Sequence, residues 1–71
     1  MCNYCFFCLD ELGVVRSIEV ISAESDNAAK RLAIKTMETR KEFSEVDLWG
    51  EGRRIYLVRR LGASLLEEHN E

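Results

Sequence analysis

The sequence predicts an α+β domain in which a four-stranded, mainly antiparallel sheet carries one helix on one face, in the order β-β-α-β-β. Two short runs rich in aromatic and β-branched residues stand first and are joined by a glycine-containing turn. After Ala23 the apolar period changes from two to 3.6 residues, which is typical of an amphipathic helix. Two further strand-like runs then flank the tripeptide "GEG". This order of periods indicates an α+β fold.

The first two runs predict a β-hairpin. Residues 3–9 read "NYCFFCL" and residues 14–23 read "VVRSIEVISA", both favourable strand compositions. The connection contains Asp10 and Gly13, two turn formers, and Gly13 suits a position with positive φ. We therefore expect the two strands to lie side by side and antiparallel.

A helix is expected from Asp26 to about Lys41. Ser25 suits the N-cap, and the carboxylate of Asp26 suits the positive end of the helix dipole. The apolar stripe of this helix comprises Ala29, Leu32, Ala33, Thr36 and Met37. Ile34 falls outside the stripe and is the one helical residue that we expect to contact another chain.

Residues 44–49, "SEVDLW", and residues 53–61, "RRIYLVRRL", predict the third and fourth strands. Gly50 and Gly52 bracket a connection of hairpin length, so these strands are expected to pair antiparallel. Residues 1–61 then form a single domain. Residues 62–71 are expected to form a C-terminal tail, either one helical turn or without fixed structure.

Composition indicates a small cytoplasmic protein. The chain has 71 residues, 46% of them hydrophobic and 32% charged, with a formal net charge of -3. No apolar run approaches the ~20 residues that span a bilayer, so no membrane partner is expected. A core of this size usually contributes only about 3 to 5 kcal/mol, which makes association with another chain plausible.

The single helix can cover only one of the two faces of the predicted sheet. Strand alternation places Phe6 and Phe7 on opposite sides of the first strand, so apolar groups remain on the second face whichever face binds the helix. Such a patch usually marks an interface. We therefore expect a non-catalytic interaction or regulatory module that binds itself as a homodimer, or a larger protein partner. The candidate partner-binding residues are Phe6, Phe7, Ile34, Trp49 and Tyr56.

The spacing C-x-x-C-x-x-C raises the possibility of a metal or redox site. On a strand, Cys2 and Cys8 lie about 20 Å apart on one face while Cys5 points to the other, so the three thiols do not converge. His69 is the only histidine and lies in the expected tail. No cofactor, metal or catalytic residue is therefore expected, and the protein is not expected to be an enzyme.

An alternative function is nucleic-acid binding through the last strand. Its four arginines are Arg53, Arg54, Arg59 and Arg60, and Tyr56 among them resembles the stacking aromatics of sheet-based RNA binders. Strict alternation places Arg53 with Arg59 on one face and Arg54 with Arg60 on the other. Charged residues on a terminal strand also protect a sheet edge from aggregation, and the acidic balance of the chain favours that explanation.

The chain resembles a group of short, uncharacterised bacterial proteins over about Tyr4 to Leu61. Their pattern is an aromatic strand ending in "LD-x-x-G", an acidic helix start followed by paired alanines, an "E-[VL]-x-W" type strand and a closing basic-apolar strand. The matching residues here are Leu9, Asp10, Gly13, Ile21, Asp26, Ala28, Ala29, Val46, Leu48, Trp49, Arg54, Val58 and Leu61. The resemblance implies the β-β-α-β-β fold and no established activity.

Overall fold

The computed structural model of the chain describes residues 1–61 and 64–69, and their side chains as far as Arg60. It confirms an α+β fold in the expected β-β-α-β-β order. The elements are β1 (Cys2–Leu9), β2 (Val15–Ala23), α1 (Asp26–Thr39), β3 (Glu45–Gly50), β4 (Arg53–Leu61) and β5 (Ser64–His69).

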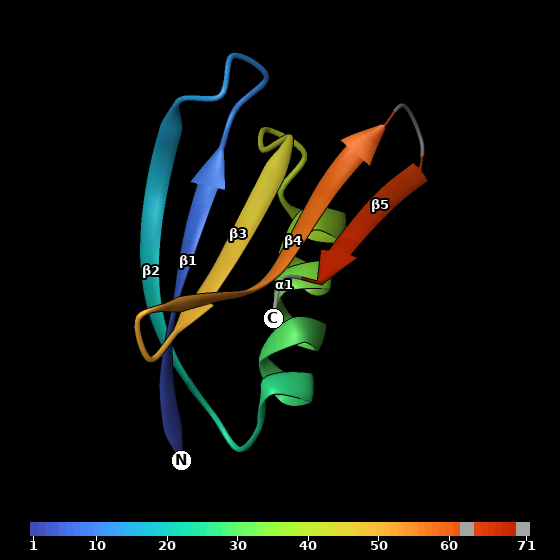
Figure 1. The fold of residues 1–71 in the computed structure, drawn as a ribbon. Helices are drawn as coiled ribbons and strands as arrows, with labels where there is room; N and C mark the ends of the chain where they lie inside the picture. Colours follow the sequence, from blue (N-terminus) through green and yellow to red (C-terminus); the bar gives the residue numbers. More distant parts are fainter. Residues whose placement is uncertain (62–63, 70–71) are drawn as a thin grey trace.

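The strands form one antiparallel sheet in the order β2-β1-β3-β4-β5, so β1 lies inside the sheet and β2 forms one edge. Helix α1 connects β2 to β3 and packs along one side of the sheet (Figure 1). The two faces of the sheet are therefore different, one covered by the helix and the other turned away from it. We call the second the open face.

The first turn depends on Asp10 and Gly13. The Asp10 carboxylate accepts hydrogen bonds from the backbone N–H groups of Leu12 at 2.9 Å and Val14 at 3.1 Å. Gly13 has φ 78°, which confirms the expected positive φ. These bonds fix the hairpin register, in which Phe7 lies opposite Ile18.

Helix α1 begins as predicted and ends slightly earlier. The Ser25 hydroxyl accepts a hydrogen bond from the Ala28 N–H at 3.2 Å, which confirms its role as N-cap. The helix ends at Thr39 and has no basic residue in its last turn. Arg60 supplies the missing cation from β4, because its guanidinium donates to the carbonyl oxygens of Met37 and Phe43.

The hydrophobic core lies between α1 and the covered face of the sheet. All its members are at most 6% exposed. They come from the helix, from each of the strands β1 to β4 and from the loop before β3. They are Tyr4, Phe6, Cys8, Ala23, Ala29, Ala33, Met37, Phe43, Val46, Leu48, Ile55, Tyr56 and Val58. The small residues Ala29 and Ala33 let the helix approach the sheet closely.

The turn between β3 and β4 consists of Glu51 and Gly52, both with positive φ, at 53° and 77°. This is the pattern of a type I′ hairpin turn, which matches the twist of the two strands. Gly50 precedes the turn for a steric reason. A Cβ atom at Gly50 would lie 2.7 Å from Tyr4 Cδ1 and 2.8 Å from Ile55 Cδ1.

Strand β4 contains a β-bulge that changes which residues share a face. Leu48 pairs with Tyr56 and Trp49 with Arg54, so Ile55 has no partner in the ladder. Ile55 joins Tyr56 in the core, although adjacent residues of a regular strand point to opposite faces. The bulge also reverses the predicted arginine pairs, as described below.

The C-terminal segment differs from the expected helical turn or unstructured tail. Ser64–His69 form β5, which pairs antiparallel with β4, with Tyr56 opposite His69 and Leu61 opposite Ser64. The reason is that β4 presents a row of backbone donors and acceptors at the edge, and a strand satisfies them. Residues 62–63 and 70–71 of the predicted tail lie outside the described residues.

Candidate interaction surface

The open face carries a continuous group of apolar side chains on β2, β1 and β3. We call it the apolar patch; it consists of Cys5, Phe7, Leu9, Val15, Ile18, Val20 and Trp49. Cross-strand pairing brings these residues together, because Cys5 lies opposite both Val20 and Trp49, and Phe7 lies opposite Ile18. The same alternation that places Phe6 in the core therefore places its neighbours on the patch.

Exposure within the patch is highest on the edge strand. Val20 is 76% exposed and Ile18 is 61% exposed, while Cys5, Phe7 and Trp49 are half-buried. Two large β-branched side chains of β2 thus form a ridge beside lower-lying groups of β1 and β3. Apolar groups with this degree of exposure on neighbouring positions mark an interaction surface more often than singly exposed residues do.

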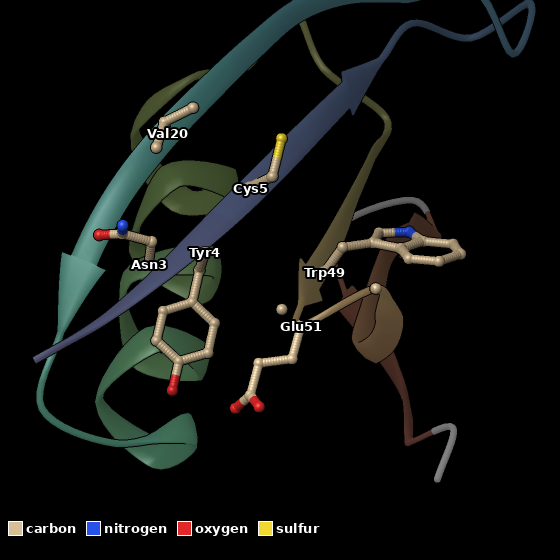
Figure 2. A pocket seen from close by; sticks show the side chains of 8 residues that line it. Asn3, Tyr4, Cys5, Val20, Trp49 and Glu51 are labelled. Atoms are coloured by element: carbon tan, nitrogen blue, oxygen red, sulfur yellow. The ribbon is translucent and has the colours of Figure 1, made fainter.

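Two shallow hollows lie beside this ridge. The larger, of about 340 Å³, is lined by Cys5, Phe7, Leu9, Val15, Asp47 and Trp49. The smaller, of about 220 Å³, has Asn3, Tyr4, Cys5, Val20, Trp49 and residues 50–52 around it. Figure 2 shows the smaller one, with Cys5 and Trp49 on neighbouring strands and Val20 on the edge strand in front of the helix. Cys5 and Trp49 line both hollows, so the two form one grooved surface.

Trp49 has the contacts of an interface anchor. Its ring meets the Phe7 ring edge to face, with centroids 6.4 Å apart and an interplanar angle of 87°. The Arg54 guanidinium lies 5.8 Å from the centroid of the indole ring. Tryptophan and arginine are the residues most enriched among the energetic hot spots of protein interfaces.

Beyond Trp49, the described side chains of the open face include the buried Leu57 and two ion pairs between β3 and β4. Arg54 forms a two-pronged ion pair with Asp47, at 2.8 and 2.9 Å. Arg59 Nε lies 3.2 Å from the Glu45 carboxylate. Each cation therefore has an anion beside it, and these pairs add little net charge to this face.

The arginines of β4 do not form the predicted groups. Because of the bulge at Ile55, Arg54 and Arg59 share the open face, while Arg53 and Arg60 lie on the helix side. Arg53 Nη2 is 3.8 Å from the Asp26 carboxylate, and Arg60 binds carbonyl groups near the end of α1. All four side chains have intramolecular partners, and they are divided between the two faces of the sheet.

The predicted partner-binding residues fall into two groups. Phe7 and Trp49 lie on the open face, as the proposed surface requires. Phe6 and Tyr56, by contrast, are 2% and 1% exposed and lie in the core under the helix, so they are not part of the apolar patch. Ile34 is half-buried and packs against the core from α1, so it also lies outside the apolar patch.

Sequence reasoning missed Ile18 and Val20 as candidates. In β2 the alternating positions Ile18, Val20 and Ser22 are all exposed in the structure. Alternation alone does not distinguish an edge strand from a central strand, and only the edge position gives these two residues their exposure.

The three thiols lie in different environments. Cys2 is exposed, Cys5 is half-buried on the open face and Cys8 is fully buried under the helix. Burial raises the pKa of Cys8 to about 11. Within the described residues, no group of three histidine, cysteine or carboxylate side chains has a geometry that could hold a metal ion.

Comparisons of the chain with protein-family models, curated proteins and solved structures find no match. In the part of the chain that the structure describes, no helix has the length and apolar character needed to span a membrane.

Proposed function

We propose that this chain is a small non-catalytic interaction module that binds a protein surface through its open face. One observation carries the proposal. The apolar patch surrounds Trp49 and extends to a ridge in which Ile18 and Val20 are 61% and 76% exposed. Leaving these groups in water is unfavourable, and their burial by another protein would recover roughly 25 cal/mol per Å² of apolar surface.

The construction of the face supports a protein rather than a small molecule as the ligand. The two hollows are shallow and share their lining residues Cys5 and Trp49. Small-molecule sites are usually concave and enclose most of the ligand. A grooved apolar centre with a polar border of ion pairs is typical of protein interfaces.

The alternative, nucleic-acid binding by the last strand, is less favourable. Arg54 and Arg59 have carboxylate partners on the open face, and binding phosphate would require breaking those ion pairs. Arg60 is engaged by backbone carbonyls on the other face. The formal net charge of -3 adds a general repulsion of polyanions.

Site-specific photocrosslinking in cells that express the full chain tests the proposal. A benzophenone side chain at Ser22, which is exposed on β2 at the border of the apolar patch, samples whatever covers the open face. The matched control carries the same group at Lys35, which is exposed on α1. We expect protein adducts from position 22 and none from position 35; adducts from neither position, or from position 35 alone, would contradict the proposal.

A further inference from the structure

We propose that the protein covering the apolar patch is a second copy of this chain, packed face to face so that the β2 ridge of each copy fills the larger hollow of the other. The inference rests on the proposed function and names its partner. It follows from three properties of the open face: complementary shape, neutral charge and limited area.

The first property is that the ridge and the hollow lie side by side on the same face. Ile18 and Val20 are exposed on the edge strand, and the hollow of about 340 Å³ lies beside them, lined by Phe7 and Leu9 of β1 and by Val15 of β2. A twofold axis running roughly along the strands near β1 superimposes each ridge on the hollow of the other copy. This arrangement is isologous, since each copy contributes the same surface. It also agrees with aligned packing of two sheets about 10 Å apart.

The second property is the charge of the face. Two copies of a chain with net charge -3 repel each other in general. On the open face, however, Asp47 is neutralised by Arg54, and Glu45 by Arg59. At the turn end of β2, Arg16 Nε lies 2.7 Å from the Asp10 carboxylate. Among residues 1–60, these carboxylates of the open face therefore each have a cation beside them, so they add little like-charge repulsion between two copies.

The third property, area, sets the strength of the dimer. The twofold axis near β1 overlaps three strands of each sheet, β2, β1 and β3; at ~4.8 Å spacing and roughly 20 Å length they present roughly 300 Å² per copy, or about 600 Å² for the pair. Interfaces of this size lie below the usual range of specific complexes, so association is reversible and weak. We therefore expect a monomer–dimer equilibrium with a dissociation constant in the micromolar range or above.

The chain contains its own reporters for this arrangement. Trp49 is the only tryptophan and lies in the patch, so its emission moves to shorter wavelength when the face leaves water. Cys5 also lies in the patch, whereas Cys2 is exposed outside it and Cys8 is buried in the core. Alkylation of Cys5 measured relative to Cys2 therefore reports coverage of the open face alone.

The experiment is sedimentation velocity of the reduced full chain from about 1 µM to about 1 mM, with tryptophan emission and mass-spectrometric thiol labelling at each concentration. We expect the chain to sediment increasingly as a dimer, with a shorter emission wavelength and slower relative alkylation of Cys5. Ile18→Glu is expected to weaken the dimer at least tenfold. The matched control Leu32→Glu, at a 40% exposed position on α1, is expected to leave it unchanged.

Three results of this experiment would overturn the inference: a monomer over the whole range, a dimer unaffected by Ile18→Glu, or a dimer in which Cys5 reacts as fast as in the monomer. The last would indicate pairing of β2 edges rather than of faces. Circular dichroism shows whether Ile18→Glu is folded. If it is not, the relative alkylation of Cys5 in the unaltered chain at each concentration tests the inference instead. Photocrosslinks from position 22 to a different protein alone would reject the homodimer and leave the proposed function standing.

Discussion

The hydroxyl of Tyr4 donates a hydrogen bond to Asp26 Oδ1 at 2.7 Å and thereby joins the first strand to the first turn of the helix. The two residues are 22 positions apart, and the Tyr4 side chain is 4% exposed. The hydrogen bond to Asp26, burial and the Asp26 charge together raise the pKa of Tyr4 to about 12. This contact fixes where the helix begins relative to the sheet.

Alkaline pH should destabilise the fold through Tyr4. Below pH 10 the phenol is protonated in both the folded and the unfolded chain, so the hydrogen bond contributes fully. Between pH 10 and about 12 the unfolded chain loses the proton first, so the free energy of unfolding falls. Denaturant titrations between pH 10 and about 12 measure this fall. In Tyr4→Phe the free energy of unfolding should depend less on pH over the same range. Tyr4→Phe should also lower Tm at neutral pH by about 4–8 °C, the shift expected for one lost hydrogen bond in a domain of this size.

The Cys8 thiol provides a separate test at lower pH. Burial raises the pKa of the Cys8 thiol from 9.0 to about 11. The protonated thiol therefore contributes fully to the free energy of unfolding below pH 9, and this contribution is lost between pH 9 and about 11. Cys8→Ala should therefore flatten the stability profile over this range while keeping the decline due to Tyr4. An unchanged slope in both ranges would show that neither group is protected in the folded chain.

Arg60 should contribute more to stability than the other arginine on the helix side. Its guanidinium donates to the carbonyl oxygens of Met37 and Phe43 and so completes the end of α1. Arg60→Met keeps much of the apolar stem and removes these bonds, which should lower the free energy of unfolding by about 1–3 kcal/mol. The control is Arg53→Met, which removes only an exposed 3.8 Å ion pair and should cost less than about 0.5 kcal/mol. Equal losses in the two variants, measured by urea unfolding, would contradict the capping role.

Gly50 should be intolerant of any side chain. A Cβ atom there would overlap Tyr4 and Ile55, so Gly50→Ala should lower the free energy of unfolding by about 1–3 kcal/mol. Gly52→Asn is the control, because Gly52 has open space around it and asparagine tolerates positive φ. Thermal unfolding should show a larger loss of stability for Gly50→Ala, where a side chain overlaps its neighbours, than for Gly52→Asn, where only the positive φ must be adopted. A stable Gly50→Ala protein would mean that Tyr4 can move aside.

Nucleic acid should bind weakly to the full chain. With the arginines of β4 engaged within the fold, we expect a dissociation constant above about 10⁻⁴ M for single-stranded RNA or DNA at physiological salt. Fluorescence anisotropy with labelled oligonucleotides measures this. Tight binding that falls steeply as salt is added would support the alternative function instead.

The sequence allowed a correct prediction of four strands, one helix and their order because each element carries a local signal. Ser25 predicts the start of the helix through a short-range hydrogen bond, and Gly13 predicts a turn through its own backbone freedom. The alternation of Tyr4, Cys5 and Phe6 likewise predicts two differently buried faces of β1. All of these depend on neighbouring residues and not on the rest of the fold.

The missed features depend on tertiary pairing. The bulge at Ile55 arises from the register of β3 against β4, and it moves Arg53 and Arg59 to opposite faces against strict alternation. The fifth strand exists because β4 has an edge to pair with. The exposure of Ile18 and Val20 likewise follows from the sheet order, so Phe7 and Trp49 could be found from sequence while the ridge beside them could not.

The position of β1 inside the sheet has a consequence for synthesis on the ribosome. Strand β1 can pair with β2 as soon as the hairpin is made, but its other neighbour is β3, which follows the whole helix along the chain. At ~5–20 residues per second, the far edge of β1 waits about two to eight seconds for that neighbour. During this interval the β1–β2 hairpin presents unpaired backbone and two aromatic-lined faces, so we expect chaperones to bind this hairpin until β3 is made.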